Sequence, residues 1–138
     1  MAATSTPSVN SLLDKLSLDY PNLIFRHGKK FLFRPPKTIF IGPPCPNHAL
    51  LTLHELAHGL LQHKNYNLDI QRLKIESSTW QKTQELCKKY NIDWDEDFAQ
   101  DHLDTYRDWL HKKSLCPTCQ LTRYQDKTGT YHCPACQS

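Results

Sequence analysis

The stretch PNHALLTLHELAHGLLQH, residues 46–63, decides the fold. Apolar residues stand on nearly every side of its helical projection, so it predicts a buried central helix. Pro46-Asn47 is expected to start this helix, with Asn47 as its N-cap, and the helix is expected to run to about His63. Two histidines and a glutamate in a buried helix need partners or a metal, because unpaired polar groups in a core are costly.

The residues upstream of this helix predict a short helix and a small sheet. A run of leucines after Ser8 has helical spacing and predicts a helix that ends before Pro21. Apolar residues 23–25 and 31–33 flank Gly28, which is a hairpin signal because a glycine is able to take a positive φ. A β-hairpin is therefore expected just before the central part of the chain.

A third strand is predicted at 38–41, directly before the central helix. Downstream, a helix is predicted over 69–90 and capped by its first residue, and another begins at Asp93 or Asp95 and ends near His111. The fold class is α+β. We expect three parts: an N-terminal segment with a short helix at 1–19, a main domain at 20–111 and a small module at 112–138.

Composition and charge exclude some classes of protein. The net charge of +3 over 138 residues is too small to indicate a nucleic-acid partner by itself. No apolar run approaches the length that crosses a bilayer, so no membrane partner is expected. The first ten residues lack the basic start and apolar stretch of a secretory signal, and a cytoplasmic location is expected.

The central helix contains the HExxH motif His54-Glu55-Leu56-Ala57-His58. Residues four apart on a helix differ by about 40° in direction, so both imidazoles face one point and can bind one zinc ion. Glu55 lies about 100° away, where its carboxylate can accept a proton from a water molecule at the metal. The alternative, a surface helix that merely carries histidines, does not fit the apolar surroundings.

A catalytic zinc site needs a third protein ligand. His63 faces the opposite side of the helix, and Lys64 stands where the HExxHxxGxxH pattern has a histidine. The other three glutamates are assigned elsewhere: one as the base, one to a helix start and one to a solvated face. Glu76 is the expected third ligand, because it belongs to an inward stripe formed by Leu73, Glu76, Trp80, Thr83, Cys87 and Tyr90.

Glu76 has an alternative role, in which its carboxylate forms a buried salt bridge with Arg72 or Arg107.

The HELAH motif, followed on the next helix by Glu76 and Trp80, resembles the gluzincin metallopeptidases. The resemblance covers roughly residues 20–90 and is closest to the small ImmA/IrrE-like peptidase domains and the minigluzincins. It implies that a glutamate on the following helix completes the zinc site and that a short sheet borders the cleft.

These features predict a zinc endopeptidase that acts on a protein or peptide substrate. Glu55 is expected to take a proton from the attacking water and pass it to the leaving amine. The strand at 38–41 is expected to be an exposed edge that holds an extended peptide. Three side chains are candidates for donating a hydrogen bond to the oxyanion: Tyr66, His102 and Tyr106.

The C-terminal segment contains two CPxC pairs and resembles zinc ribbons. Each pair can hold a metal from a tight turn, and the segment 120–132 between the pairs suits a hairpin. We expect one structural zinc ion here in addition to the catalytic one, because so short a segment has too little core to fold alone. A disulfide or redox pair is the alternative. The four expected ligands are Cys116, Cys119, Cys133 and Cys136.

The C-terminal ribbon could also touch nucleic acid. Weak nucleic-acid contact through the ribbon would combine stacking with phosphate contacts. Cys45 and Cys87 are expected to be ordinary apolar residues. The ribbon side chains considered for nucleic acid are Arg123, Tyr124, Lys127 and Tyr131.

Two other functions compete with the peptidase reading. SprT-like DNA-associated proteases also pair HExxH with a C-terminal zinc ribbon, but their third ligand is a downstream histidine, here His102 or His111. The other alternative is a DNA- or protein-binding module in which the HExxH zinc only stabilises the fold.

Overall fold

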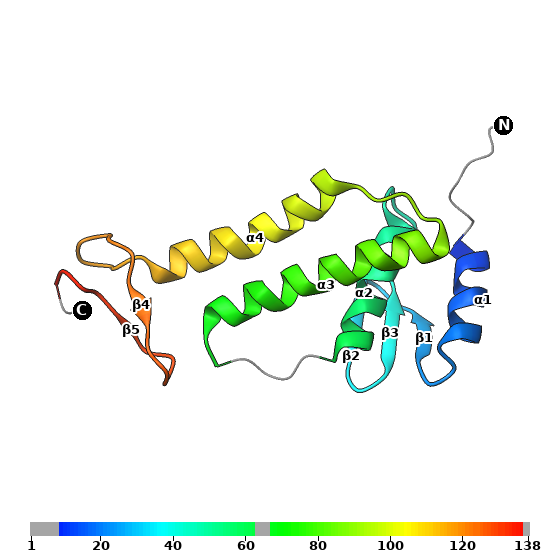
Figure 1. Cartoon of the computed structure of the whole chain (residues 1–138), viewed down its shortest axis with the longest axis horizontal. Helices are drawn as coiled ribbons and strands as arrows, with labels where there is room; N and C mark the ends of the chain where they lie inside the picture. The colour runs from blue at the N-terminus through cyan, green and yellow to red at the C-terminus, as the bar shows by residue number, and fades with distance from the viewer. Residues whose placement is uncertain (1–8, 63–66, 137–138) are drawn as a thin grey trace. The chain divides into compact units, whose positions relative to one another are not determined.

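The computed structural model describes residues 9–62 and 67–136, and these form an α+β arrangement as predicted. The elements are labelled in Figure 1. In chain order they are α1 (Val9–Asp19), β1 (Ile24–His27), β2 (Leu32–Arg34), β3 (Thr38–Ile41), α2 (His48–Leu61), α3 (Asp69–Tyr90), α4 (Glu96–Ser114), β4 (Tyr124–Gln125) and β5 (Tyr131–His132).

The chain divides into two compact units. The first contains residues 1–63 and 79–94, and the second contains residues 64–78 and 95–138. The helix α3 contributes to both, because the boundary at residues 78 and 79 falls inside it. No described helix combines the length and the apolar character that crossing a bilayer requires.

In the first unit β3 is the central strand of a three-stranded sheet with the order β1-β3-β2 (Figure 1). It pairs in parallel with β1, so that Phe25 lies opposite Ile39, and antiparallel with β2, so that Phe33 lies opposite Ile39. Two predictions were therefore wrong. Residues 23–33 do not form a hairpin, and the strand at 38–41 is not an edge that can hold a peptide.

The strand order follows from burial. Ile39 and Ile41 are almost completely buried, so β3 gains most from the central position, where both of its neighbours exclude water. The backbone N–H of Gly28 donates to the carbonyl of Ile41 at 2.9 Å instead of closing a turn. Gly28 is not among the described residues with positive φ. The glycine signal is local, whereas the pairing that determines the sheet joins residues far apart in the sequence.

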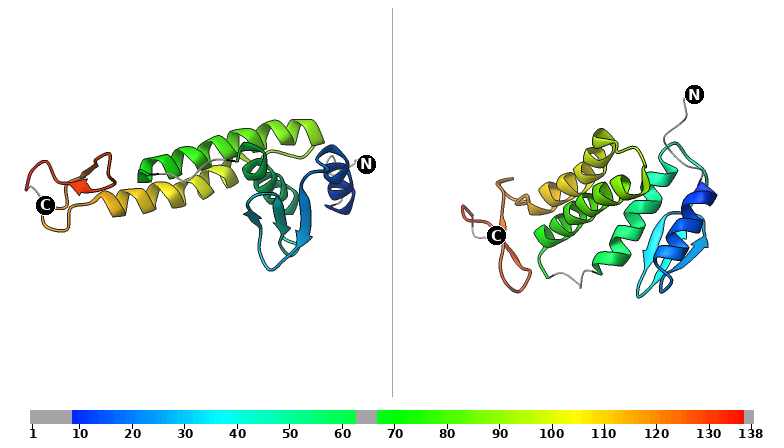
Figure 2. Two further views of the ribbon diagram at one scale, coloured as in Figure 1. Left: turned by 90° about the horizontal axis from the view of Figure 1, so that it is seen from below. Right: turned by 45° about the vertical axis from the view of Figure 1, so that its right-hand side comes forward.

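The helix α2 packs on the face of the sheet that carries Ile39 (Figure 2). Its Gly59 allows a close approach: a Cβ atom there would lie 3.2 Å from the Phe33 ring and 3.6 Å from the Ile39 side chain. Leu53 and Leu56 are completely buried. The helix has the predicted position in the sequence. Because the Gly59 side of α2 faces the sheet, the histidines point away from the sheet.

The ends of α2 differ from the prediction in one detail. Asn47 is the N-cap residue, but its side chain makes no capping hydrogen bond. The start of the helix is held instead by the His48 ring, whose Nε2 lies 2.9 Å from the carbonyl oxygen of Gly42. At the other end Gln62 adopts a left-handed conformation and its N–H donates to the carbonyl of His58.

In the second unit the carboxylate of Asp69 does not cap its own helix, contrary to the prediction. It accepts a hydrogen bond from the Tyr131 hydroxyl at 2.6 Å and pairs with Lys113 at 3.1 Å. Burial opposes ionisation, but these two bonds outweigh it and lower the pKa of Asp69. The side chain therefore ties the start of α3 to the C-terminal module.

The remaining elements of the second unit follow the prediction closely. Asp95 is the N-cap of α4, and its carboxylate accepts a hydrogen bond from the N–H of Phe98 at 3.0 Å. The helix ends at Ser114 rather than near His111. The predicted hairpin in the C-terminal module is present, because β4 and β5 pair antiparallel.

Two leucines of α1 provide a test of the core. Leu16 is completely buried and Leu18 is 81% exposed. Leu16→Ala should lower the free energy of unfolding by about 2–5 kcal/mol, because it leaves a cavity. Leu18→Ala should change it by less than about 0.5 kcal/mol. Urea denaturation followed by circular dichroism measures both, and similar effects of the two changes would contradict this packing.

Candidate metal centres

The first candidate centre lies on α2, where one turn of helix presents the HExxH side chains together. The ligand atoms of His54, Glu55 and His58 all lie within 4.8 Å of one another. The two imidazole rings have their centroids 4.8 Å apart and are nearly perpendicular. The spacing predicted from the sequence is therefore present, and the three residues can hold a metal ion.

The ring of His54 is enclosed by the second half of α3. It is 4% exposed and stacks on the indole of Trp80, with ring centroids 3.9 Å apart and an interplanar angle of 22°. Trp94 contacts the same indole edge-on at 6.0 Å. The Trp80 ring thus keeps water from one side of the imidazole and is itself held by Trp94, so the His54 side chain has little rotational freedom.

The protons around His54 can be assigned from Thr83. The Thr83 hydroxyl donates its single hydrogen to the carbonyl of Thr79 at 2.7 Å. Its oxygen also lies 3.3 Å from Nδ1 of His54, and it can only accept there, because its proton is already used. This arrangement favours the His54 tautomer that carries its proton on Nδ1 and has its lone pair on Nε2.

This tautomer is the one that a metal site requires. Metal-binding histidines donate the N–H of one ring nitrogen to a neighbouring group and bind the metal through the other. The sequence placed Trp80 and Thr83 on the inward stripe of the 69–90 helix but gave neither a role at the metal. The signal was their helical spacing, and the missing information was which histidine they would meet.

The other residues predicted for this centre lie on α3 and α4 or outside the described part of the chain. Glu76 is buried, at 7% exposure, in the part of α3 that belongs to the second unit. Its role as a metal ligand stays a prediction. The His102 ring packs against the ring of Phe98, with ring centroids 4.7 Å apart. Tyr66 lies outside the described residues.

Arginine side chains that were considered as partners of Glu76 make other contacts. The guanidinium of Arg72 lies over the rings of Tyr106, at 5.2 Å, and of Trp109, at 4.9 Å. That of Arg107 binds Asp104 at 2.8 Å and Gln100 at 2.9 Å. These contacts give Tyr106 a packing role and leave its role as an oxyanion donor a prediction.

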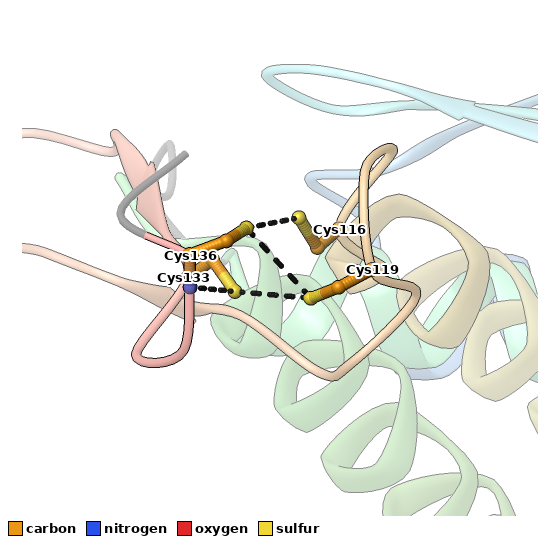
Figure 3. A group of neighbouring side chains, drawn as sticks. All are labelled: Cys116, Cys119, Cys133 and Cys136. Atoms are coloured by element: carbon orange, nitrogen blue, oxygen red, sulfur yellow. Dashed lines mark hydrogen bonds between the residues drawn. The ribbon is translucent and has the colours of Figure 1, made fainter.

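The second candidate centre is the group of four cysteines in the C-terminal module (Figure 3). The sulfur of Cys136 lies 3.3 Å from that of Cys116 and 3.7 Å from that of Cys119, which lies 3.5 Å from that of Cys133. All four are free thiols rather than disulfides. Zinc–sulfur bonds of about 2.3 Å give a tetrahedron with edges of about 3.8 Å, which these distances approach.

The pKa values of the thiols differ within this group. Hydrogen bonds from the backbone of Cys119 lower the pKa of Cys116 to about 5. The backbone N–H of Leu121 has the same effect on Cys119, but the neighbouring thiols outweigh it and raise its pKa to about 12. Four thiolates cannot lie so close together unless a cation neutralises them. The donor set therefore fits a divalent, thiophilic metal such as zinc.

Side chains of the hairpin support this cysteine cluster. Asp126 accepts hydrogen bonds from Thr128, and it pairs with His132 at 2.6 Å. Arg123 donates to the backbone carbonyl of Lys113 at 3.0 Å and lies over the ring of Tyr131. Two of the four side chains considered for nucleic-acid contact, Arg123 and Tyr131, are thus engaged in holding the module together.

The two lone cysteines lie outside both centres. Cys45 is exposed, and Cys87 is buried. Burial raises the pKa of the Cys87 thiol to about 11, so it is a poor nucleophile at neutral pH.

Comparison of the chain with protein-family models, curated proteins and solved structures finds no match.

The assignment of Thr83 can be tested by metal affinity. Thr83→Val keeps the shape of the side chain but removes the hydrogen-bond acceptor, and it should weaken zinc binding at the HExxH centre by about 10–100-fold. Thr83→Ser should restore it. Competition with a chromophoric chelator measures the affinity. Thr52→Val is the matched control, because Thr52 is equally buried and makes the same bond to the carbonyl four residues earlier.

The cysteine centre can be tested by metal content. Cys119→Ser should lower the zinc content from about two ions per chain to about one and unfold the C-terminal module, because this segment has too little core without the metal. Cys45→Ser should leave both ions bound. Mass spectrometry under native conditions counts them, and a fully loaded Cys119→Ser protein would contradict a four-thiolate site.

Proposed function

We propose that this protein is a zinc-dependent peptidase with a second, structural zinc site in its C-terminal module. Two observations support the first part: the ligand atoms of His54, Glu55 and His58 lie within 4.8 Å of one another, and the contact of Thr83 with Nδ1 of His54 favours the tautomer that suits metal binding. A carboxylate that shares a site with two metal-binding imidazoles is suited to proton transfer. Four cysteines, in contrast, fill all positions of a tetrahedral ion.

Each residue of the first centre has its own proposed role. His54 and His58 would hold the zinc ion through neutral imidazole nitrogens, and Glu76 is the proposed third protein ligand. Zinc in such a site supplies Lewis acidity, which activates water and polarises a peptide carbonyl. Glu55 accepts the proton of the attacking water and delivers it to the leaving amine. His102, Tyr106 and Tyr66 stay candidate donors to the oxyanion.

The proposed setting is a reducing compartment such as the cytoplasm. All described cysteines are free thiols, and four of them gather at a site that suits a metal better than two disulfides. The SprT-like alternative differs in its third ligand, which would be His102 or His111 in place of Glu76. The binding-module alternative differs in that the first centre would have no reaction to perform.

Substitution of Glu55 separates catalysis from metal binding. Glu55→Gln should keep about two zinc ions per chain, because the amide is not needed to hold the metal, and should lower peptide hydrolysis by at least about 10²-fold. A proteome-derived peptide library read by mass spectrometry detects the cleavage. No cleavage by the unchanged, zinc-loaded protein would support the binding-module alternative.

Substitution of the third ligand distinguishes the two enzyme classes within the same experiment. Glu76→Gln should remove the ion of the first centre, and His102→Ala and His111→Ala should retain it. Loss of the ion from a histidine variant, with retention in Glu76→Gln, would favour the SprT-like arrangement. Glu85→Gln is the control, since this exposed glutamate lies on the same helix.

A further inference from the structure

The three-stranded sheet has a second face that α2 does not cover. Side chains alternate between the two faces of a strand. Ile39 and Phe33 lie on the face that contacts Gly59 of α2. Their neighbours Phe40 and Leu32 are cross-strand partners on the opposite face, where Arg26 of β1 also pairs with Phe40. This opposite face carries positively charged side chains.

No aspartate or glutamate occurs from Tyr20 to His54, a stretch that contains all the strands of this sheet. The same stretch contains five lysines and arginines, and all of them are exposed. Among the ion pairs within the described residues none involves any of the five. Arg26 and Arg34 have the same strand parity as Phe40, and Lys29 and Lys30 lie in the loop between β1 and β2. We call these four, together with Phe40, the basic sheet surface: Arg26, Lys29, Lys30, Arg34 and Phe40.

The basic sheet surface contains a hollow of roughly 220 Å³. Its lining combines cations with apolar groups. The Arg34 guanidinium lies over the Phe40 ring, 5.1 Å from the ring centroid. Gly28 keeps the hollow open, because a Cβ atom there would lie 3.1 Å from Cδ1 of Phe40. The lining residues are Gly28, Lys29, Lys30, Leu32, Arg34 and Phe40.

We propose that the basic sheet surface binds single-stranded nucleic acid. These four cations have no ion-pair partner in the part of the chain that the structure describes, so phosphate groups can neutralise them and release condensed ions. The guanidinium of Arg34 lies over the half-buried Phe40 ring, and a planar cation supported by an aromatic ring is a group on which bases stack. A hollow between the cations accommodates a base while the backbone follows the charges.

The lining of the hollow favours nucleic acid over an acidic polypeptide. Carboxylate side chains would need only the cations, and the ring of Phe40 and the side chain of Leu32 would contribute nothing specific to them. A base has an apolar face for these groups and is joined to phosphates that reach the lysines. The ribbon is a weaker candidate, because its Arg123 and Tyr131 already bind other residues of their own unit.

The test uses the full chain with zinc bound and fluorescently labelled single-stranded RNA and DNA 12-mers of mixed sequence. Anisotropy should show binding that weakens as salt rises, with a slope of log K against log salt of about −0.7 per neutralised phosphate. The triple variant Lys29→Ala, Lys30→Ala and Arg34→Ala should bind at least about tenfold more weakly and have a slope shallower by about 2. Phe40→Leu should weaken binding and leave the slope unchanged.

The control is a second triple variant with the same loss of charge, Lys15→Ala, Lys74→Ala and Lys88→Ala, whose residues are all exposed and lie outside the sheet. It should bind nearly as well as the unchanged protein. Equal weakening by both triples, no binding at low salt, or displacement of the oligonucleotide by an equal concentration of polyglutamate would overturn the proposal. So would loss of binding in Lys127→Ala alone, which would assign it to the ribbon.

Circular dichroism establishes that each variant is folded, and the double variant Lys29→Gln and Lys30→Gln provides a milder change outside the strands. It should weaken binding in the same direction by a smaller factor. Binding is measured without any peptide, so its outcome is independent of whether the HExxH centre hydrolyses peptide bonds.

Discussion

The first compact unit depends on a single helix that meets different demands on its two sides. On one side α2 must approach the sheet closely, and Gly59 permits this by leaving room for the rings and methyl groups of β2 and β3. On the other side it buries an imidazole against Trp80 and Thr83 of α3. Burial of a polar ring is costly unless its nitrogens are satisfied, so the apolar packing of the helix and the chemistry of its histidines constrain each other.

The two candidate metal centres differ in how their ligand atoms are supported. At the four cysteines the ligand atoms come from two tight turns, where a cation would relieve the mutual repulsion of thiolates. On α2 the candidate ligands His54, Glu55 and His58 come from one turn of a helix whose apolar side chains are buried. This helix therefore has apolar packing of its own beside the candidate centre.

Much of this arrangement could be predicted from the sequence because its signals are local. The helical periodicity of α2 and α3, the HExxH spacing and the paired CPxC turns each lie within a short stretch. The strand order could not be predicted in this way, since the glycine at 28 looks like a turn while the burial of Ile39 and Ile41 decides the pairing. The role of Thr83 was also hidden, because it depends on where its one proton goes. Glu76 as a ligand stays a prediction.

The close packing at Gly59 affects how substitutions at this position would be interpreted in a mutagenesis screen. It touches no metal and performs no chemistry, yet a side chain larger than alanine there would push α2 away from Phe33 and carry His58 with it. A random mutagenesis screen for variants that lose metal from the HExxH centre would therefore recover this codon beside those of the histidines. Without the structure such an allele would be mistaken for a change in a metal ligand, although its defect is one of steric fit.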